Sequence, residues 1–319
     1  MPKIAKQPPK SLEEKVLEQP IFEGLDIDKA IEVMKAHGFK VEPNGVGEIN
    51  AAPDLIRSDQ NITHNDLPSG RWYHLNGDDD LNNWRPSVTT ILQYPNKGPG
   101  MDTWYKNYGH LADSMRDAAG IRGTAVHYWI RALVEGSEVT AEQIRAMILD
   151  SDDHTWRTTY TTADYFTYTI RRYLESFVAF WKEHKPVIVA CEYPIYNKEL
   201  DYAGRLDLIV RMKKAKNSKK DSLVMMDIKT GRKFDSHALQ NSAYAHGWNL
   251  EHPDMKIDHI AGLYVTDGYR KDPTYTLHYQ KYDYSYFRHI LTVWYGSKRD
   301  SEGNVGPKLR TQPATTFKL

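Results

Sequence analysis

Three strand-like segments follow one another between residues 187 and 230, and short links join them. The segments span residues 187–196, 202–212 and 223–230 and are rich in β-branched and aromatic residues. The links, residues 197–201 and 213–221, are too short for a crossover helix, so neighbouring strands must run antiparallel. The sequence therefore predicts a three-strand antiparallel meander.

Segments with helical spacing surround this meander. Before it we expect helices at roughly 101–119, 123–135, 140–150 and 161–184. After it we expect a helix at 235–249, strands at 257–266 and 274–281, and a helix at about 283–296. The strand at 257–266 would return parallel to the third meander strand through a crossover helix. The order of elements predicts an α/β core with a mixed sheet flanked by helices, preceded by a helical region.

The first 70 residues differ from the rest of the chain. They are punctuated by Pro8, Pro9 and Pro20, contain one credible helix at 28–37, and are polar and rich in proline, glycine and asparagine from residue 42. We expect a partly extended N-terminal arm over residues 1–70, a domain over 71–300 and a tail over 301–319. Within the domain, 71–185 would be mostly helical and 186–300 would hold the sheet. Residues 71–75 read as a strand, and Ser87 can cap the apolar run 88–92.

Composition limits the kind of site that this chain can build. Its single cysteine, Cys191, excludes internal disulfides, four-cysteine zinc sites and four-cysteine iron–sulfur clusters, and fits a reducing cytoplasm. No apolar run reaches the roughly 18 residues of a membrane helix. The formal net charge is zero, whereas nucleic-acid binders are often basic. This balance argues mildly against a nucleic-acid partner, but local charge matters more than the total.

The third meander strand places charge on one of its faces only. Side chains alternate across a strand, so Asp227 and Lys229 share one face, while Val224, Met226 and Ile228 form an apolar face. Antiparallel pairing can bring Asp207, on the second strand, close to Asp227. Two neighbouring carboxylates repel unless a cation joins them, and oxygen ligands suit Mg²⁺ or Mn²⁺. A neighbouring amine could orient or help to deprotonate a water, or stabilise the charge that develops during hydrolysis of a phosphodiester.

Asp-x-Lys by itself is common, and a surface ion pair would explain it equally well, so the metal-site interpretation depends on companions. His127 lies at the edge of a helical apolar stripe, where it could be a ligand or a packed core histidine. Gln240 and Tyr244 share one face of the helix after the third strand, and either border the site or brace a loop. Glu192, on the first strand, could complete a metal shell or pair with an arginine.

These segments, in this order, resemble the RecB-like branch of the PD-(D/E)xK nuclease superfamily. The ordered signature of that branch is Gly-x-x-x-His, a Glu-bearing strand, Gly-x-x-Asp, Asp/Glu-x-Lys and Gln-x-x-x-Tyr. The chain carries all five in that order: Gly123 with His127, Glu192, Gly204 with Asp207, Asp227 with Lys229, and Gln240 with Tyr244. Residues 85–92 are also similar to a segment that precedes the core in phage and mitochondrial members. The resemblance covers roughly residues 71–285.

The resemblance implies a restriction-endonuclease-like fold and a role for each motif residue. His127, Asp207, Asp227 and the Ile228 carbonyl would bind Mg²⁺ or Mn²⁺, with Glu192 as the least certain ligand. Lys229 would act on the attacking water, and Gln240 and Tyr244 would brace the site or contact DNA. Several relatives bind an iron–sulfur cluster through four cysteines, which this chain lacks. It therefore looks more like the cluster-free phage or mitochondrial type.

Cationic and aromatic side chains near these motifs are candidates for DNA contacts. The first group is Arg122, Arg131, Arg205 and Arg232, which could contact phosphates or brace the site. Five lysines between 213 and 220 form either a solvated hairpin or a grip on the phosphate backbone. The aromatic candidates, for which core packing is an equal alternative, are Trp104, Tyr105, Tyr108 and Trp129.

The expected activity is a metal-dependent DNA exonuclease acting in replication, recombination or DNA degradation, encoded by a phage and located in the host cytoplasm. A recombination or single-strand-binding protein is an expected partner, and the oligomeric state is left open. Two alternatives remain at this point: a catalytically silent nuclease-fold module that only binds DNA or assembles with other proteins, and a structure-specific endonuclease. The complete charge set of Asp207, Asp227 and Lys229 argues against a purely binding module.

Overall fold

The computed structural model describes residues 55–58, 62–75, 84–93, 99–213, 215, 220–268 and 272–298. The helix expected at 28–37, most of the N-terminal arm and the C-terminal tail lie outside these residues. Within the described part of the chain, no helix is both long and apolar enough to cross a membrane.

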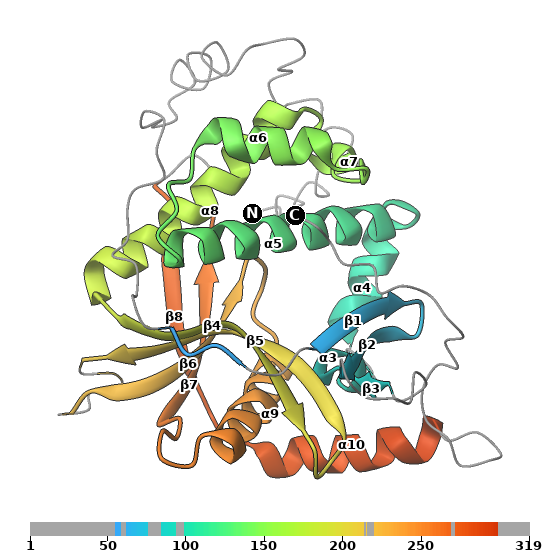
Figure 1. Ribbon diagram of the computed structural model, residues 1–319. Coiled ribbons are helices and arrows are strands. Elements are labelled where there is room, and N and C mark those ends of the chain that lie inside the picture. Colours follow the sequence, from blue (N-terminus) through green and yellow to red (C-terminus); the bar gives the residue numbers. More distant parts are fainter. Residues whose placement is uncertain are drawn as a thin grey trace, which may run out of the picture.

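The centre of the molecule is a five-stranded mixed sheet with the order β4-β5-β6-β7-β8 (Figure 1). As predicted, the meander β4–β5–β6 is antiparallel and β7 returns parallel to β6 after helix α9. Strand β8, for which no direction was predicted, is antiparallel to β7. The strands are β4 (Val187–Asn197), β5 (Tyr202–Met212), β6 (Ser222–Lys229), β7 (His259–Val265) and β8 (Tyr275–Gln280).

Helices cover both faces of this sheet, and each face has its own apolar core. One core packs Val224, Met226 and Ile228 of β6 beneath helices α5, α6 and α8. The other packs alternate residues of the same strand, Leu223 and Met225, against α9 and α10. The helices are α4 (Pro99–Tyr108), α5 (Leu111–Val134), α6 (Ala141–Asp150), α7 (Arg157–Tyr160), α8 (Ala163–His184), α9 (Ser236–Glu251) and α10 (Tyr284–Lys298).

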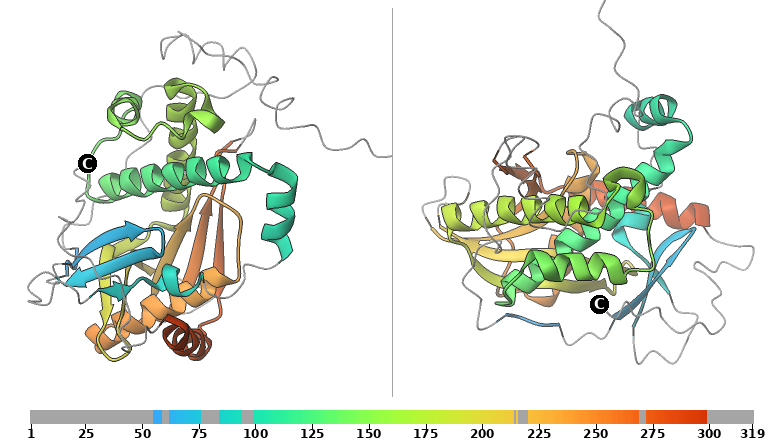
Figure 2. Two further views of the ribbon diagram at one scale, coloured as in Figure 1. Left: turned by 90° about the vertical axis from the view of Figure 1, so that its right-hand side faces the viewer. Right: turned by 90° about the horizontal axis from the view of Figure 1, so that it is seen from above.

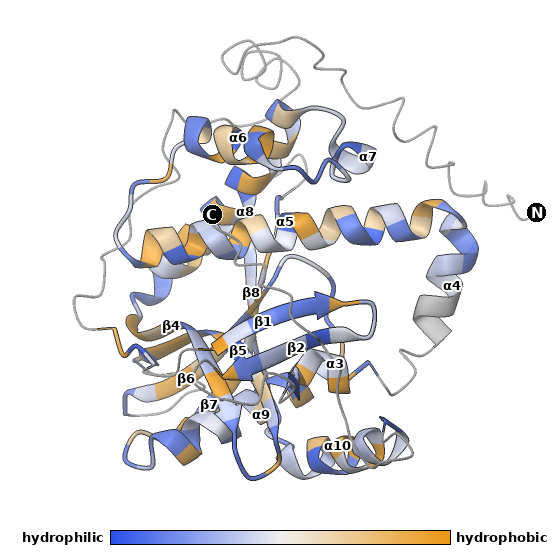
Figure 3. Ribbon diagram, turned by 45° about the vertical axis from the view of Figure 1, so that its right-hand side comes forward, coloured by the Kyte–Doolittle hydropathy of each residue, from blue (hydrophilic) through white to orange (hydrophobic). Residues whose placement is uncertain are grey.

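Helix α5 differs from its prediction, because it is one continuous helix where two were expected. The expected break at 120–122 is absent: Gly120 and Gly123 lie inside α5, and apolar and polar residues alternate along its whole length (Figure 3). The chain instead turns at Gly109, which has a φ of 52°, so that α4 leaves the end of α5 at a steep angle (Figure 2). Burial of Ala118 and Ala125, with partly buried Ile121 between them, outweighs the modest helical penalty of two glycines.

A small second sheet lies beside β5, and part of it was not predicted. It has the order β1-β2-β3, with β1 (Ile62–Leu67), β2 (Gly70–Leu75) and β3 (Arg85–Pro86). The strand expected at 71–75 is present, but β1 was expected to be an extended surface segment. Because β1 is largely hydrophilic, its pattern gave no strand signal (Figure 3). It nevertheless pairs with all of β2, so a boundary at residue 70 falls inside a hairpin.

The segment after β3 folds as its sequence predicted. Ser87 caps the short helix α3 (Val88–Ile91), and its Oγ accepts a hydrogen bond from the Thr90 amide at 2.9 Å. The Thr90 hydroxyl in turn donates to the Arg71 carbonyl at 2.9 Å. This bond ties α3 to β2, and a parallel bridge between Ser87 and Ala203 joins the same segment to β5 of the central sheet.

Candidate metal centre

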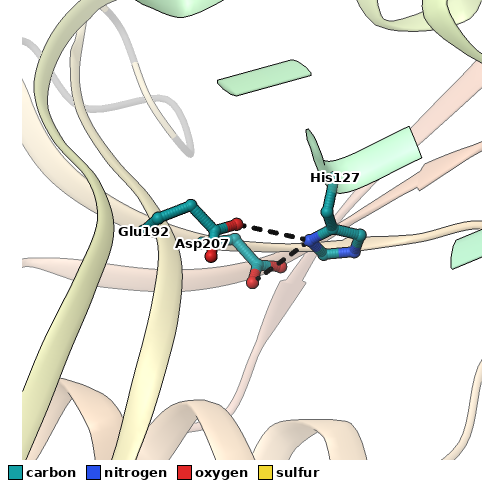
Figure 4. A group of neighbouring side chains, drawn as sticks. All are labelled: His127, Glu192 and Asp207. Carbon is teal, nitrogen blue, oxygen red and sulfur yellow. Dashed lines mark ion pairs between the residues drawn. The ribbon is translucent and has the colours of Figure 1, made fainter. Parts of the chain in front are cut away.

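Three ligand-type side chains from three different elements meet at the centre of the main sheet. They are His127 from α5, Glu192 from β4 and Asp207 from β5, and one ligand atom of each lies within 4.8 Å of the others. His127 Nδ1 is 3.5 Å from Asp207 Oδ1 and 3.6 Å from Glu192 Oε1 (Figure 4). The structure thus brings together residues that are up to 80 positions apart in sequence, counting from 127 to 207.

The backbone of Glu192 directs its carboxylate into this group. The pairs Cys191–Leu208 and Tyr193–Leu206 place Glu192 opposite Asp207 in the β4–β5 register. Its φ of 47° lies in the left-handed region, which is unfavourable for a residue with a Cβ. The second carboxylate oxygen, Oε2, is 3.9 Å from Arg205 Nη1. Glu192 therefore faces both His127 and Arg205, and its part in a metal shell stays a prediction.

Asp227 and Lys229 lie next to this group at the C-terminal end of β6. Lys229 Nζ donates a hydrogen bond to Asp227 Oδ1 at 2.7 Å, as expected for two residues on one strand face. Gln240 Nε2, from α9, donates to the same oxygen at 3.3 Å. Asp227 is 3% exposed, and its other oxygen, Oδ2, is buried without a hydrogen-bond partner in the described structure. A buried, unpaired carboxylate oxygen is the kind of atom that a cation would satisfy.

The peptide group of Ile228 joins the two halves of the site. Its N–H donates to Asp207 Oδ2 at 2.7 Å, and its carbonyl oxygen lies 3.0 Å from His127 Nε2. A backbone group therefore fixes the relative positions of β5, β6 and α5. The same carbonyl oxygen is an available donor atom for a metal ion.

The charges of His127, Glu192 and Asp207 compensate one another. Burial would lower the pKa of His127, but Asp207 and Glu192 raise it well above its usual value. Burial would raise the pKa of Asp207, but the charges of His127 and Lys229 and the amide of Ile228 lower it. These shifts favour an imidazolium between carboxylates wherever no cation is bound.

Asp227 and Lys229 form the second charged pair. Burial raises the pKa of Asp227 to about 6, because Lys229 offsets only part of the desolvation and Asp207 adds repulsion. Burial would lower the pKa of Lys229, but Asp227 and Asp207 raise it. Lys229 is consequently an ammonium donor at neutral pH rather than a free base.

Tyr244 and Gly204, which belong to separate sequence motifs, pack directly on each other. Tyr244 is 4% exposed, and a Cβ at Gly204 would overlap its ring. Glycine at 204 is therefore required by a close approach, not by backbone conformation. Gln240 contacts Asp227 directly, whereas buried Tyr244 is placed to brace β5 against α9.

The four candidate arginines have different environments. Arg122 is turned inward, where Nη1 donates to the Tyr160 hydroxyl at 3.0 Å and Nη2 to the Thr230 carbonyl at 3.1 Å. Arg131 pairs with Glu135 at 3.2 Å. Arg205 faces Glu192, and Arg232 is exposed in the loop after β6. Arg122 thus braces α5 against the end of β6, while Arg232 remains accessible.

Some of the other side chains expected to contact DNA lie within the described residues. Lys213 and Lys220 are exposed, and the remaining lysines of that loop, Lys214, Lys216 and Lys219, lie outside the described residues. Trp129 is 7% exposed and belongs to the core, so the packing alternative holds for it. The partly exposed rings of α4, which contact one another, are those of Trp104, Tyr105 and Tyr108.

Tyr264 is a neighbour of the site that sequence reasoning missed. The parallel pairing of β6 with β7 places Tyr264 beside Lys229 and Gly262 beside Asp227. Its ring leans back over Gly262, where an added Cβ would lie 2.7 Å from Tyr264 Cε2. No local pattern reveals this proximity, because it depends on the register of two strands separated by α9.

The donor set fits a divalent cation. It offers one imidazole, the carboxylates of Glu192, Asp207 and Asp227, and the Ile228 carbonyl, and hard cations such as Mg²⁺ and Mn²⁺ favour oxygen-rich sets of this kind. Anionic phosphate could approach such a cation beside the Lys229 ammonium. The arrangement therefore has the elements of metal-assisted hydrolysis of a phosphate ester.

Comparison with known proteins identifies one related family. A family model for the PD-(D/E)XK nuclease superfamily matches residues 103–279. This range contains every residue of the two charged groups and the whole of the five-stranded sheet except the last residue of β8. A comparison with curated proteins gives no match.

Proposed function

Because the chain belongs to the PD-(D/E)XK nuclease superfamily, whose members are nucleases, we propose that it is a metal-dependent DNA exonuclease. We place it in the RecB-like branch, with the cluster-free phage or mitochondrial type, since its one cysteine cannot hold an iron–sulfur cluster. The proposed setting is phage DNA replication, recombination or degradation in the host cytoplasm, with a recombination or single-strand-binding protein as partner.

The observation that carries this proposal is the meeting of His127, Glu192 and Asp207 beside the Asp227–Lys229 pair. A structural ion-pair cluster would satisfy its own polar atoms. This one leaves Asp227 Oδ2 buried and unpaired, and it keeps Asp227 at a raised pKa. Perturbed, partly unsatisfied carboxylates next to a cationic side chain are typical of functional sites rather than of structural ones.

Each residue has a proposed role in hydrolysis. His127, Asp207, Asp227 and the Ile228 carbonyl would hold Mg²⁺ or Mn²⁺, with Glu192 facing the same group. The bound cation would supply Lewis-acid charge neutralisation at the phosphate and a more acidic water.

The remaining side chains fix the geometry around the attacking water. Lys229, held by Asp227 Oδ1, would orient the water and donate to the phosphate oxygen on which charge develops. Gln240 would fix the Asp227 carboxylate from the side of α9.

The test compares wild type with Asp227→Ala and Lys229→Ala on linear DNA labelled at the 5′ or the 3′ end, with Mg²⁺, Mn²⁺ or EDTA. We expect metal-dependent loss of mononucleotides from one end by wild type, and a loss of activity of at least about a hundredfold in both variants. Asp254→Ala, at an exposed acid outside the site, is the matched control and should retain activity. Cleavage that persists in both site variants would overturn the assignment.

A circular substrate decides between the modes of cleavage. An exonuclease leaves covalently closed DNA intact, so cutting of circles would replace the proposal by an endonuclease. If wild type cleaves no substrate with any of the metals but still binds DNA, the protein is a binding module instead.

A further inference from the structure

The loop between β6 and α9 extends from the catalytic strand directly into solvent. Residues 231–236 are exposed, and they follow Lys229 after a single intervening residue. The loop holds two cations, Arg232 and Lys233, followed by Phe234, whose exposed fraction is 49%. An aromatic ring exposed to this degree beside two cations and an active centre is a candidate contact for a nucleotide.

Phe234 is the outer member of a row of three rings. Its ring meets that of His237 edge-on, with centroids 5.5 Å apart at 80°. His237 is stacked on Tyr264, with centroids 6.0 Å apart at 29°, and His237 Nδ1 is hydrogen-bonded to the Tyr264 hydroxyl at 3.0 Å. The inner ring is in turn held over Gly262, which pairs with Asp227. The exposed ring is therefore supported by a packed row that begins beside the metal centre.

This row is uncharged at neutral pH. Burial and the positive charge of Lys229 lower the pKa of His237 to about 4, so its imidazole is neutral. The cationic groups of the loop are confined to Arg232 and Lys233. The loop therefore offers an uncharged aromatic surface that follows two cations and precedes one exposed acid, Asp235. An exposed ring beside positive charge is the combination that binds single-stranded nucleic acid.

We propose that Phe234, supported by His237 and Tyr264, stacks on an unpaired base of the DNA strand whose phosphate lies at the metal centre. Arg232 and Lys233 contact the adjacent phosphates. Bases inside a duplex are already stacked on both faces, so only a single-stranded or frayed end can use this surface. The inference rests on the proposed nuclease function and refines its substrate to DNA with an unpaired end.

Binding measured in EDTA tests the stacking step without cleavage. The probe is a fluorescent single-stranded oligonucleotide, read by anisotropy, with a blunt duplex of the same sequence for comparison. Phe234→Ala should weaken single-strand binding about tenfold, leave blunt-duplex binding unchanged, and be rescued by Phe234→Trp. Tyr286→Ala, which removes a similarly exposed ring from α10, is the matched control and should bind as wild type.

A second measurement locates the base. Single abasic positions are introduced along the oligonucleotide, one per probe. Wild type should lose about tenfold in affinity at one position, and Phe234→Ala should be insensitive to the same lesion, because the two changes remove one interaction. This comparison separates stacking from a general loss of affinity.

The outcomes are distinct. Equal single-strand binding by Phe234→Ala and wild type, or an equal loss on single strands and blunt duplex, would overturn the stacking proposal. That result leaves the nuclease assignment standing if wild type degrades end-labelled DNA with a metal. Wild type that degrades no DNA and binds neither probe removes both proposals together.

Discussion

Glu192 is the residue of the candidate centre whose backbone conformation is unfavourable for its residue type. Its positive φ is costly for a side chain with a Cβ, and conformations of this kind typically cost of order 1–3 kcal/mol. They persist where the surroundings enforce them, which is common in functional sites. Here the strained backbone aims a carboxylate at His127 and Asp207.

The strain can be measured with two neutral substitutions. Asn tolerates the left-handed region better than Gln does, and both remove the charge. Glu192→Asn should therefore unfold at higher urea than Glu192→Gln, by about 1 kcal/mol in the free energy of unfolding, while both weaken metal binding. Equal stabilities for the two metal-free variants would show that the backbone carries no strain.

Metal binding should compete with protons at this site. Metal ligands must be deprotonated, whereas His127 has a raised pKa and that of Asp227 is about 6. A raised folded-state pKa means that the protonated form stabilises the metal-free fold, and that this contribution is lost as pH rises through that pKa. Affinity for Mn²⁺ should thus increase as pH rises through about 6, and binding should release protons.

Calorimetry in two buffers with different ionisation enthalpies measures this release. At pH 6 the apparent binding enthalpy of wild type should depend on the buffer. Asp227→Asn, which removes the group that titrates near pH 6, should show a smaller dependence. Buffer-independent enthalpies for wild type would refute the competition.

At the scale of elements, two helical glycines, one exposed and one buried, allow the effect of packing on stability to be compared. Gly120 in α5 is exposed, with open space where a Cβ would stand, whereas Gly247 in α9 is buried against Ile195. Alanine is favoured over glycine in a helix by about 1 kcal/mol. Gly120→Ala should therefore raise the melting temperature.

Gly247→Ala should lower the melting temperature, because its Cβ would overlap Ile195 and overpacking costs about 1–3 kcal/mol. Thermal denaturation, monitored by circular dichroism, compares the two variants. Both are glycine-to-alanine changes in a helix, so they gain the same helix propensity. A gain in stability for both would show that α9 shifts easily on the sheet.

Features that depend on residues close together in the sequence were predictable from it. Short links made the β4–β5–β6 meander antiparallel, and alternation placed Asp227 and Lys229 on one face. Strand β1 was missed because a polar edge strand has no apolar alternation to reveal it. Tyr264 was missed for a different reason, since its place beside Lys229 follows from the register across a crossover.

At the scale of the whole molecule, the candidate centre joins elements from both layers. His127 comes from α5, above the sheet, and Gln240 from α9, below it (Figure 1). A cation bound to residues of α5, β4, β5 and β6 would stabilise this arrangement as a unit. The stability of the entire domain should consequently depend on metal concentration.

Thermal denaturation at increasing Mn²⁺ measures this linkage. At about a hundred times the dissociation constant, the gain is roughly 2.7 kcal/mol, which raises the melting temperature by several degrees in a chain of this size. The double variant His127→Ala with Asp207→Ala should show no such increase, whereas Asp254→Ala should respond as wild type. An equal increase in all three proteins would place the bound cation elsewhere.

The contact between Gly204 and Tyr244 has a consequence for how this protein can change. Because the ring fills the space that any Cβ at 204 would need, the two positions are epistatic. A larger residue at 204 is tolerable only after the aromatic at 244 has been exchanged for a smaller one. Mutational routes through this region therefore have a fixed order, and a library that varies position 204 alone would return mostly destabilised clones.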